Sequence, residues 1–334
     1  MSLIYASEVP DPQSLFLRDP QAVVVEWQGL RALKLSGQGA CLLVVPDLLL
    51  PQGRIEVEIG AQGAAYAGIA FRLIDSLNYE LAYAQPHTTG KWDALQYDPV
   101  FHGSNTWQLY HGSGSQMTTQ VPTGSWFTLR LSFQGQRAML QVDEQPPLWI
   151  NRLAHVQQDG FVGLWSYLPA HFRQLRVSDD LPDFSAADFP PAARHPTAGM
   201  VSEWFLEGFG MLSCEPNGIL NLNRYLPVST TVAHLQREIE LEQEGELTFT
   251  LGFSDELSLR IDDQEIYHGE NLWQDTPEWS ERGYVSLDRQ VIRHLNRGRY
   301  RLTAVLSARE YFGYGMTLRI EGDNYQLLPA RWLK

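Results

Sequence analysis

Cysteine is scarce in this chain of 334 residues, and long hydrophobic runs are absent. Cys41 and Cys214 lie far apart, without a CxxC motif or the spacing of a disulfide framework. No stretch approaches the roughly 18 consecutive apolar residues of a membrane span. The beginning, MSLIYASEVPDPQSLF, lacks the basic start and apolar run of a signal peptide. As written, the sequence predicts a cytoplasmic protein without a membrane partner, or a secreted or periplasmic one if a leader was removed.

Positive charge is also in short supply. Lys and Arg number 25 against 39 Asp and Glu, which gives a net charge of −14. Such a surface disfavours the phosphate backbone of nucleic acids and anionic membranes as partners. The share of hydrophobic residues, 44%, is nevertheless that of a folded globular protein.

No long amphipathic helix is evident before residue 180, and short β-rich segments take its place. Residues 53–111 consist of runs ended by Gly, Pro, Asn or polar clusters, which is typical of consecutive antiparallel strands. In 54–59 the apolar residues Ile55, Val57 and Ile59 alternate with charged ones. Because side chains alternate across a strand, we expect one apolar and one solvated face.

The same stretch is dense in side chains that both stack and hydrogen-bond. Aromatic rings cover the C–H face of a sugar, while planar polar groups take its hydroxyls. The alternative is that these rings form the sandwich core. The residues expected to bind carbohydrate are Arg72, Tyr79, Glu80, Asp93, Gln96, Tyr97 and Trp107.

The segment GRIEVEIGAQGAAYAGIAFRLIDSLNYELAYAQPH resembles the concanavalin A-like lectin/glucanase superfamily, and more closely its laminin-G-like and 3-keto-disaccharide-hydrolase-type jelly rolls of bacteria. The later GFVGLWSYLPAHFRQLRVS resembles the closing strands of that fold, so the likeness covers about residues 20–178. It implies a jelly roll and does not by itself imply an activity. These jelly rolls carry G-x-x-E on one strand, GI-x-FR on the next and NYY or NYE on the third. The residues that match this pattern are Gly53, Glu56, Gly68, Ile69, Phe71, Arg72, Asn78, Tyr79 and Glu80.

Residues 181–199 interrupt the strand pattern with four prolines and small residues, so we expect a linker pinned by Phe184 and Phe189. The predicted domains are therefore 1–180 and 200–334. The second domain also reads as strands, although 230–240 fits a helix as well. Its run GFSDELSLRIDDQEIYHG followed by HLNRGRYRLTAVLS resembles galactose-binding-like jelly rolls. The expected fold is all-β, with two β-sandwich domains joined by a Pro-rich linker.

The sequence offers little for catalysis. Retaining glucanases of the resembling superfamily carry E-x-D-x-x-E, and here the final acid of the string that begins at Glu56 is replaced by Ala61. Glu56 and Glu58 are better explained as a solvated strand face. If the protein is an enzyme, Glu80 and Asp93 are the candidate acid and base. The histidines show no metal-binding spacing, so neither a metal nor another cofactor is expected.

The leading hypothesis is a non-catalytic carbohydrate-binding protein of bacterial type, whose partner is a carbohydrate or glycoconjugate. Two alternatives stay open. One is a glycoside-cleaving hydrolase of the 3-keto-disaccharide type, and the other is a protein interaction module.

Overall fold

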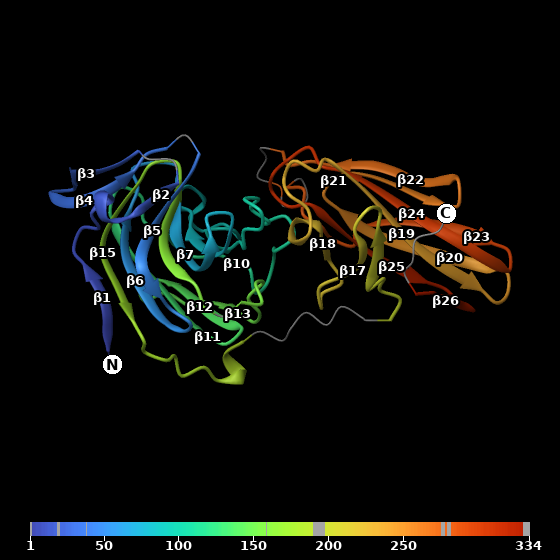
Figure 1. Ribbon diagram of the computed structural model, residues 1–334, viewed down its shortest axis with the longest axis horizontal. Helices are drawn as coiled ribbons and strands as arrows, with labels where there is room; N and C mark the ends of the chain where they lie inside the picture. The colour runs from blue at the N-terminus through green and yellow to red at the C-terminus, as the bar shows by residue number, and fades with distance from the viewer. Residues whose placement is uncertain are drawn as a thin grey trace. The chain divides into compact units, whose positions relative to one another are not determined.

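The computed structural model describes residues 2–18, 21–37, 39–157, 159–189, 198–274, 278 and 282–329. Contacts between Cα atoms divide the chain into two compact units. Unit 1 comprises Met1–Gly103 and Tyr110–Ala192, and unit 2 comprises Ser104–Leu109 and Ala193–Lys334. Each unit is built from antiparallel strands (Figure 1). Of the described residues, only four short 3₁₀ turns are helical: η1 (Pro12–Ser14), η2 (Pro86–Thr88), η3 (Ala186–Asp188) and η4 (Leu222–Arg224).

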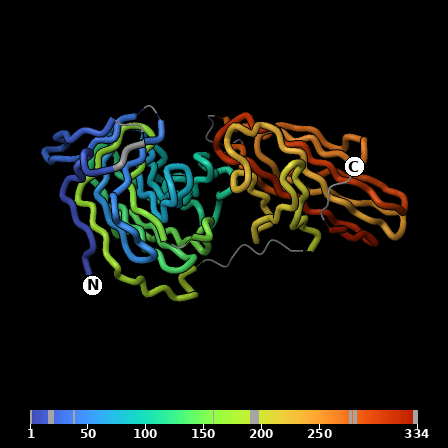
Figure 2. The backbone as a smooth tube through the Cα atoms, in the orientation of Figure 1, coloured from blue at the N-terminus to red at the C-terminus, as the bar shows by residue number. Residues whose placement is uncertain are grey.

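One of the two sheets of unit 1, sheet A, contains eight strands. The N-terminal strand lies beside a strand from the end of the unit, as the backbone trace shows (Figure 2). The strand order is β13 (Leu148–Ile150), β12 (Arg137–Val142), β11 (Trp126–Gln134), β6 (Gly53–Gly60), β15 (Ala170–Ser178), β4 (Leu30–Leu35) and β3 (Ala22–Trp27), with β1 (Leu3–Ser7) paired to β15.

The other sheet of unit 1, sheet B, contains seven strands. It holds most of the stretch that the sequence marks as a candidate site. The order is β10 (Gln116–Met117), β9 (Leu95–Tyr97), β8 (Asn78–Ala84), β7 (Tyr66–Asp75), β14 (Phe161–Tyr167), β5 (Ala40–Leu49) and β2 (Phe16–Arg18).

Strand β6 shows why the alternating sequence folds as a half-buried strand. Ile55, Val57 and Ile59 are fully buried in the core. On the other face, Glu56 forms an ion pair with Arg130 of β11 at 2.5 Å, and Glu58 forms one with Arg173 of β15 at 2.9 Å. The prediction of a solvated acidic face is confirmed, and cross-strand arginines balance its charge.

Unit 2 is a second sandwich of two antiparallel sheets around its own core, which includes Trp204, Phe249, Phe253 and Leu318. Residues 232–240 of the segment that the sequence left open between helix and strand lie in strand β19 (Val232–Leu241). The larger sheet has the order β17 (Gly210–Ser213), β16 (Glu203–Leu206), β19 (Val232–Leu241), β24 (Gly298–Ser307), β21 (Asp255–Ile261) and β22 (Gln264–Asn271), with β26 (Tyr325–Leu327) paired to β19. The smaller has the order β18 (Leu220–Asn221), β25 (Gly315–Glu321), β20 (Gly245–Phe253) and β23 (Arg289–Leu295).

The all-β fold class with β-sandwich units is thus confirmed. Of the predicted linker, residues 190–197 lie outside the described part of the chain. Before them, Phe184 and Phe189 pack edge-on against Trp149, with ring centroids 5.8 and 5.1 Å away. The expectation that these phenylalanines pin the segment to a domain is confirmed.

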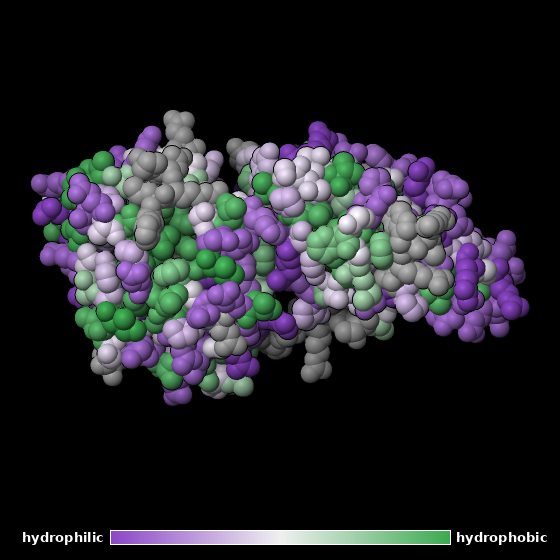
Figure 3. Space-filling model, viewed as in Figure 1, coloured by the Kyte–Doolittle hydropathy of each residue, from purple (hydrophilic) through white to green (hydrophobic). Residues whose placement is uncertain are grey.

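The described helical turns include none long and apolar enough to cross a membrane. On the face drawn in Figure 3, hydrophobic and hydrophilic residues alternate in small patches over unit 1. The part of unit 2 that carries β22 and β23 is mostly hydrophilic in this view.

Candidate functional site

Sheet B has two faces with different chemistry, and the predicted site residues divide between them. Phe71 lies directly opposite Glu80 in the register of β7 and β8, so the two share a face. The Phe71 ring packs against the Phe133 ring of sheet A, with the two centroids 5.0 Å apart. This face, the inner face, therefore looks into the sandwich. Tyr79, Leu81 and Tyr83 alternate with Glu80 and form the outer face.

On the inner face, Glu80 and Tyr97 hold a loop to the sheet. The Tyr97 hydroxyl donates to Glu80 Oε2 at 2.6 Å, and the His155 amide donates to Oε1 at 2.8 Å. The Ala154 amide donates in turn to the Tyr97 hydroxyl at 2.7 Å. Burial, followed by the neighbouring Glu80 charge, raises the pKa of Tyr97 well above its usual range. Both oxygens of this fully buried carboxylate are therefore engaged with the protein itself.

Arg72 also belongs to the interior. It stands at an irregularity in β7, with a left-handed φ of +46°. Its guanidinium group donates to the Gly135 carbonyl and lies 5.5 Å from the centre of the Phe133 ring. Burial lowers the pKa of Arg72, while the charge of Glu80 raises it to a smaller extent. This arginine is 1% exposed and offers no surface to a ligand.

The outer face of sheet B carries a continuous cross-strand row, which we call the amide–aromatic row. Directly opposite residues of antiparallel strands share a face and lie in contact range. The amides stand at one end and the rings at the other. In order across five strands, the row is Gln116, Gln96, Tyr83, Gly68 and Trp165.

Gly68 is required at the centre of this row. A Cβ atom there would lie 2.1 Å from the Ala82 carbonyl oxygen and 2.5 Å from the Tyr83 Cα. Because Gly68 has no Cβ atom, the rings of Tyr83 and Trp165 approach each other from the two strands that flank β7. Their centroids lie 5.4 Å apart. The glycine of the matched "GI-x-FR" pattern therefore lets two aromatic rings meet above the sheet.

Three further rings lie at the rim of the outer face, and we call them the aromatic rim. Tyr66 and Tyr167 are direct cross-strand neighbours, with ring centroids 5.8 Å apart. His87 stands edge-on to Tyr66 at 4.7 Å and hydrogen-bonds through Nδ1 to the Ala65 carbonyl. Tyr167 is 42% exposed and His87 is exposed. Here the outer face presents aromatic surface to solvent.

The amide end holds polar atoms that the protein leaves unsatisfied. Gln85 Nε2 donates to the Asp93 carbonyl at 2.5 Å and to Gln96 Oε1 at 3.3 Å. Gln116 Nε2 donates to the same Gln96 oxygen at 3.4 Å. Asp93 Oδ1 and Gln96 Nε2 are buried and have no hydrogen-bond partner among the described residues. An acceptor and a donor thus remain open in one small cluster.

The remaining predicted residues do not join this arrangement. Tyr79 lies on the outer face, in the same buried apolar cluster as Tyr83 and Trp165, and its ring is 1% exposed. Trp107 belongs to unit 2, where it packs against Tyr284 at 5.6 Å and Phe312 at 5.3 Å.

Sequence reasoning missed the rim residues Tyr66, His87 and Tyr167 as well as Gln85, Gln116 and Trp165. An available signal was the spacing of Trp165 and Tyr167, which puts both rings on one face of a strand. The described residues contain no cluster of three or more His, Cys, Asp or Glu that could hold a metal ion.

No family model matches the sequence, and no curated protein matches it either. Among solved structures, the chain is similar to carbohydrate-binding module CBM66 from Bacillus subtilis, with 16% identity and a TM-score of 0.37 over 47% of this chain and 92% of that one. A protein of unknown function with a galectin-like fold from Bacillus subtilis is 9% identical, with a TM-score of 0.42 over 54% and 96%.

The β-glucanase of Bacillus licheniformis is 10% identical, with a TM-score of 0.37 over 53% of this chain and 98% of that one. Likenesses at this level assign neither a family nor an activity.

Proposed function

We propose that the protein binds carbohydrate without cleaving it, through the outer face of sheet B. The observation that carries the proposal is the amide–aromatic row, in which the rings of Tyr83 and Trp165 lie 5.4 Å apart and the Gln96 amide nitrogen is unsatisfied. Gln96 belongs to this row, and Asp93 shares the partner Gln85 with it; both residues were expected from the sequence. The aromatic rim at Tyr66 and Tyr167 is the surface on which a sugar ring would stack.

The chemistry of the unsatisfied atoms favours a hydroxyl group as the ligand. A sugar hydroxyl both donates and accepts, so it can pair with an open acceptor such as Asp93 Oδ1 or with an open donor such as Gln96 Nε2. A buried polar atom without a partner costs about 1–3 kcal/mol, so its satisfaction contributes to affinity. A hydroxyl-rich ligand with an apolar ring face therefore suits both halves of the outer face.

Hydrolysis has less support than binding. A glycosidase needs two carboxyl groups beside the scissile bond. Glu80 is buried on the inner face, with its oxygens bonded to Tyr97 and His155. Asp93 remains, and its neighbours are amides that suit a binding role.

The two β-sandwiches each resemble a known type of jelly roll in sequence. We propose that residues 20–178 form a concanavalin A-like jelly roll and that residues 200–321 form a galactose-binding-like one. The β-sandwich of each unit supports these assignments without distinguishing them from other sandwich families.

A glycan-array screen of the full chain tests the proposal. We expect saturable binding that is lost in Tyr167→Ala. Tyr311→Ala is the matched control, because it removes an exposed tyrosine from unit 2. A blank array for the wild type would overturn the proposal and favour a protein partner. Equal losses in both variants would contradict the assignment to the aromatic rim.

A further inference from the structure

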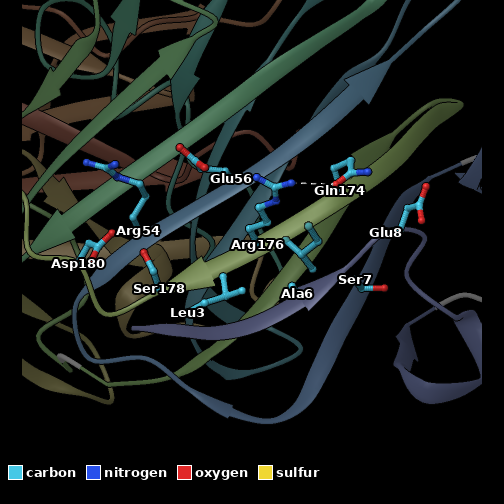
Figure 4. Close-up of a pocket in the computed structure, with 11 residues that line it drawn as sticks. Leu3, Ala6, Ser7, Glu8, Arg54, Glu56, Gln174, Arg176, Ser178 and Asp180 are labelled. Atoms are coloured by element: carbon cyan, nitrogen blue, oxygen red, sulfur yellow. Dashed lines mark hydrogen bonds between the residues drawn. The ribbon is translucent and has the colours of Figure 1, made fainter. Parts of the chain in front are cut away.

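A groove of about 490 Å³ lies on the polar face of sheet A, on the other sheet from the proposed carbohydrate site. Strands β1, β6 and β15 contribute its walls (Figure 4). In this view Arg54 and Arg176 flank Glu56, and Asp180 lies beside Arg54. The lining residues are Leu3, Ala6, Ser7, Glu8, Arg54, Glu56, Gln174, Leu175, Arg176, Ser178 and Asp180.

A β-bulge directs Arg176 to this face. Arg173 lies opposite Glu58, and Arg176 lies opposite Glu56, so β15 has one more residue than β6 between these pairs. In a regular strand, positions 173 and 176 would face opposite sides of the sheet, because they are three residues apart. Gln174 accommodates the bulge with a φ of +52°. Its backbone N–H donates to the Glu8 carbonyl at 2.8 Å. A non-glycine residue with a left-handed φ costs about 1–3 kcal/mol, so the surrounding contacts must hold this bulge in place.

Neither arginine of the groove is neutralised. Within the described part of the chain, no carboxylate oxygen lies within 4.0 Å of the guanidinium group of Arg54 or Arg176. Their side-chain partners are neutral: Ser132 for Arg54 at 3.3 Å, and Gln174 for Arg176 at 3.4 Å. Glu56, which lies between them, already forms an ion pair with Arg130. In a protein of net charge −14, two arginines without a carboxylate partner in one groove form a local positive site.

The spacing of the two arginines suits one oxyanion. Arg54 lies opposite Ser178, and Arg176 is two residues from Ser178 on the same face. The arginines are therefore diagonal neighbours, about 7 to 8 Å apart at the backbone and closer at the flexible tips. Guanidinium groups bind planar carboxylates through paired hydrogen bonds.

The rest of the groove suits the other groups of a sugar. The carboxylates of Glu8 and Asp180 are acceptors for hydroxyl groups, and Ser178 both donates and accepts. Leu3 and Ala6 supply an apolar wall for C–H groups. A simple inorganic anion would contact only the arginines and would make no use of these hydroxyl-binding groups.

We propose that this groove binds a sugar acid, with its carboxylate held by Arg54 and Arg176 and its hydroxyl groups by Ser178, Glu8 and Asp180. The site is separate from the outer face of sheet B and does not depend on the function proposed there. The ligand of this groove would carry a negative charge, whereas the carbohydrate proposed for sheet B needs no charge.

Titration calorimetry of the full chain with sodium D-glucuronate tests the proposal. We expect a Kd of about 1 mM, typical of one small ligand in an open groove. Arg176→Gln should weaken binding about tenfold, because a charge-assisted pair of hydrogen bonds is lost. Arg173→Gln is the matched control: it removes the same charge from the same strand, at a residue already paired with Glu58. High salt should weaken glucuronate binding, and glucose should not bind in this groove.

Several outcomes would overturn the proposal. Absence of saturable glucuronate binding would do so, and so would an equal loss in Arg173→Gln. Inorganic sulfate that binds as tightly as glucuronate would show an anion site without preference for a sugar. Tyr167→Ala separates the two proposals: it should abolish binding at the aromatic rim and leave glucuronate binding unchanged. Loss of glucuronate binding in that variant would assign this ligand to sheet B instead.

Discussion

The hydroxyl of Tyr97 donates a 2.6 Å hydrogen bond to Glu80 Oε2 inside the sandwich of unit 1. The pair joins β8 to β9 and, through the amides of Ala154 and His155, fixes the following loop. A residue that the sequence offers as a catalytic acid thus has a structural use that occupies both of its oxygens.

Glu80→Gln should therefore lower the free energy of unfolding by about 1–3 kcal/mol, because a glutamine amide nitrogen would face a donor where the carboxylate accepted. Denaturant titration measures the change. Glu144→Gln is the control, since that side chain is 90% exposed, and it should stay within about 0.5 kcal/mol of the wild type. Equal stability of the two variants would contradict the structural role of Glu80.

Gly68→Ala should destabilise unit 1 by about 3 kcal/mol or more. The added methyl group would overlap the backbone of β8, which cannot move without separating the rings of Tyr83 and Trp165. Gly63→Ala provides the comparison, because a Cβ there meets no atom within 4 Å. A Gly68→Ala protein as stable as Gly63→Ala would show that β8 can shift to accommodate a methyl group at position 68.

The sequence was sufficient to predict the all-β fold. The alternation in β6 predicts which residues are buried, and Asp93 and Gln96, two of the candidate polar residues, both accept hydrogen bonds from Gln85. Tyr79 and Glu80 illustrate a limit that periodicity itself imposes, because adjacent residues of a strand face opposite sides.

Other features depend on register and long-range packing, which local pattern does not encode. The bulge at Gln174 directs Arg176 to the face of Arg173, although simple alternation would separate them. Trp107 lies in a strand-rich part of the first half of the sequence, yet its contacts are with unit 2.

The stability of the protein should fall as the pH drops below about 6.5, in part because of His171. Its ring stacks on Trp27 and donates through Nδ1 to the Gly60 carbonyl. Burial, the largest effect, lowers the pKa of His171, so the unfolded chain binds a proton more readily than the folded one. The stabilisation is present above the unfolded pKa of about 6.5 and is lost as the pH falls through the folded one.

Denaturant titrations between pH 7 and pH 5 check this dependence. His171→Gln should show a smaller loss of stability over the interval than the wild type does. His234→Gln, at an exposed histidine of unit 2, is the control variant. A pH dependence that is identical for the His171 variant and the wild type would remove His171 from the explanation.

Cys214 should not react with thiol reagents in the folded protein. Burial, followed by the charge of Glu215, raises the pKa of its thiol to about 12, and the thiol donates to the Val201 carbonyl. Because the thiolate is the reactive form, labelling at pH 8 should be slow for Cys214 and for the fully buried Cys41. Both should label after denaturation, and rapid labelling of Cys214 in the native state would contradict its burial.

The central claim is that sugar hydroxyls meet Asp93 and Gln96, and calorimetric titration of Asp93→Asn with the strongest glycan from the array tests it most directly. We predict a loss of affinity of about tenfold or more, since an amide cannot replace a charged acceptor. Asp183→Asn, at an exposed acid of the same unit, should bind like the wild type. An unchanged affinity in Asp93→Asn, with the fold intact, would contradict the account.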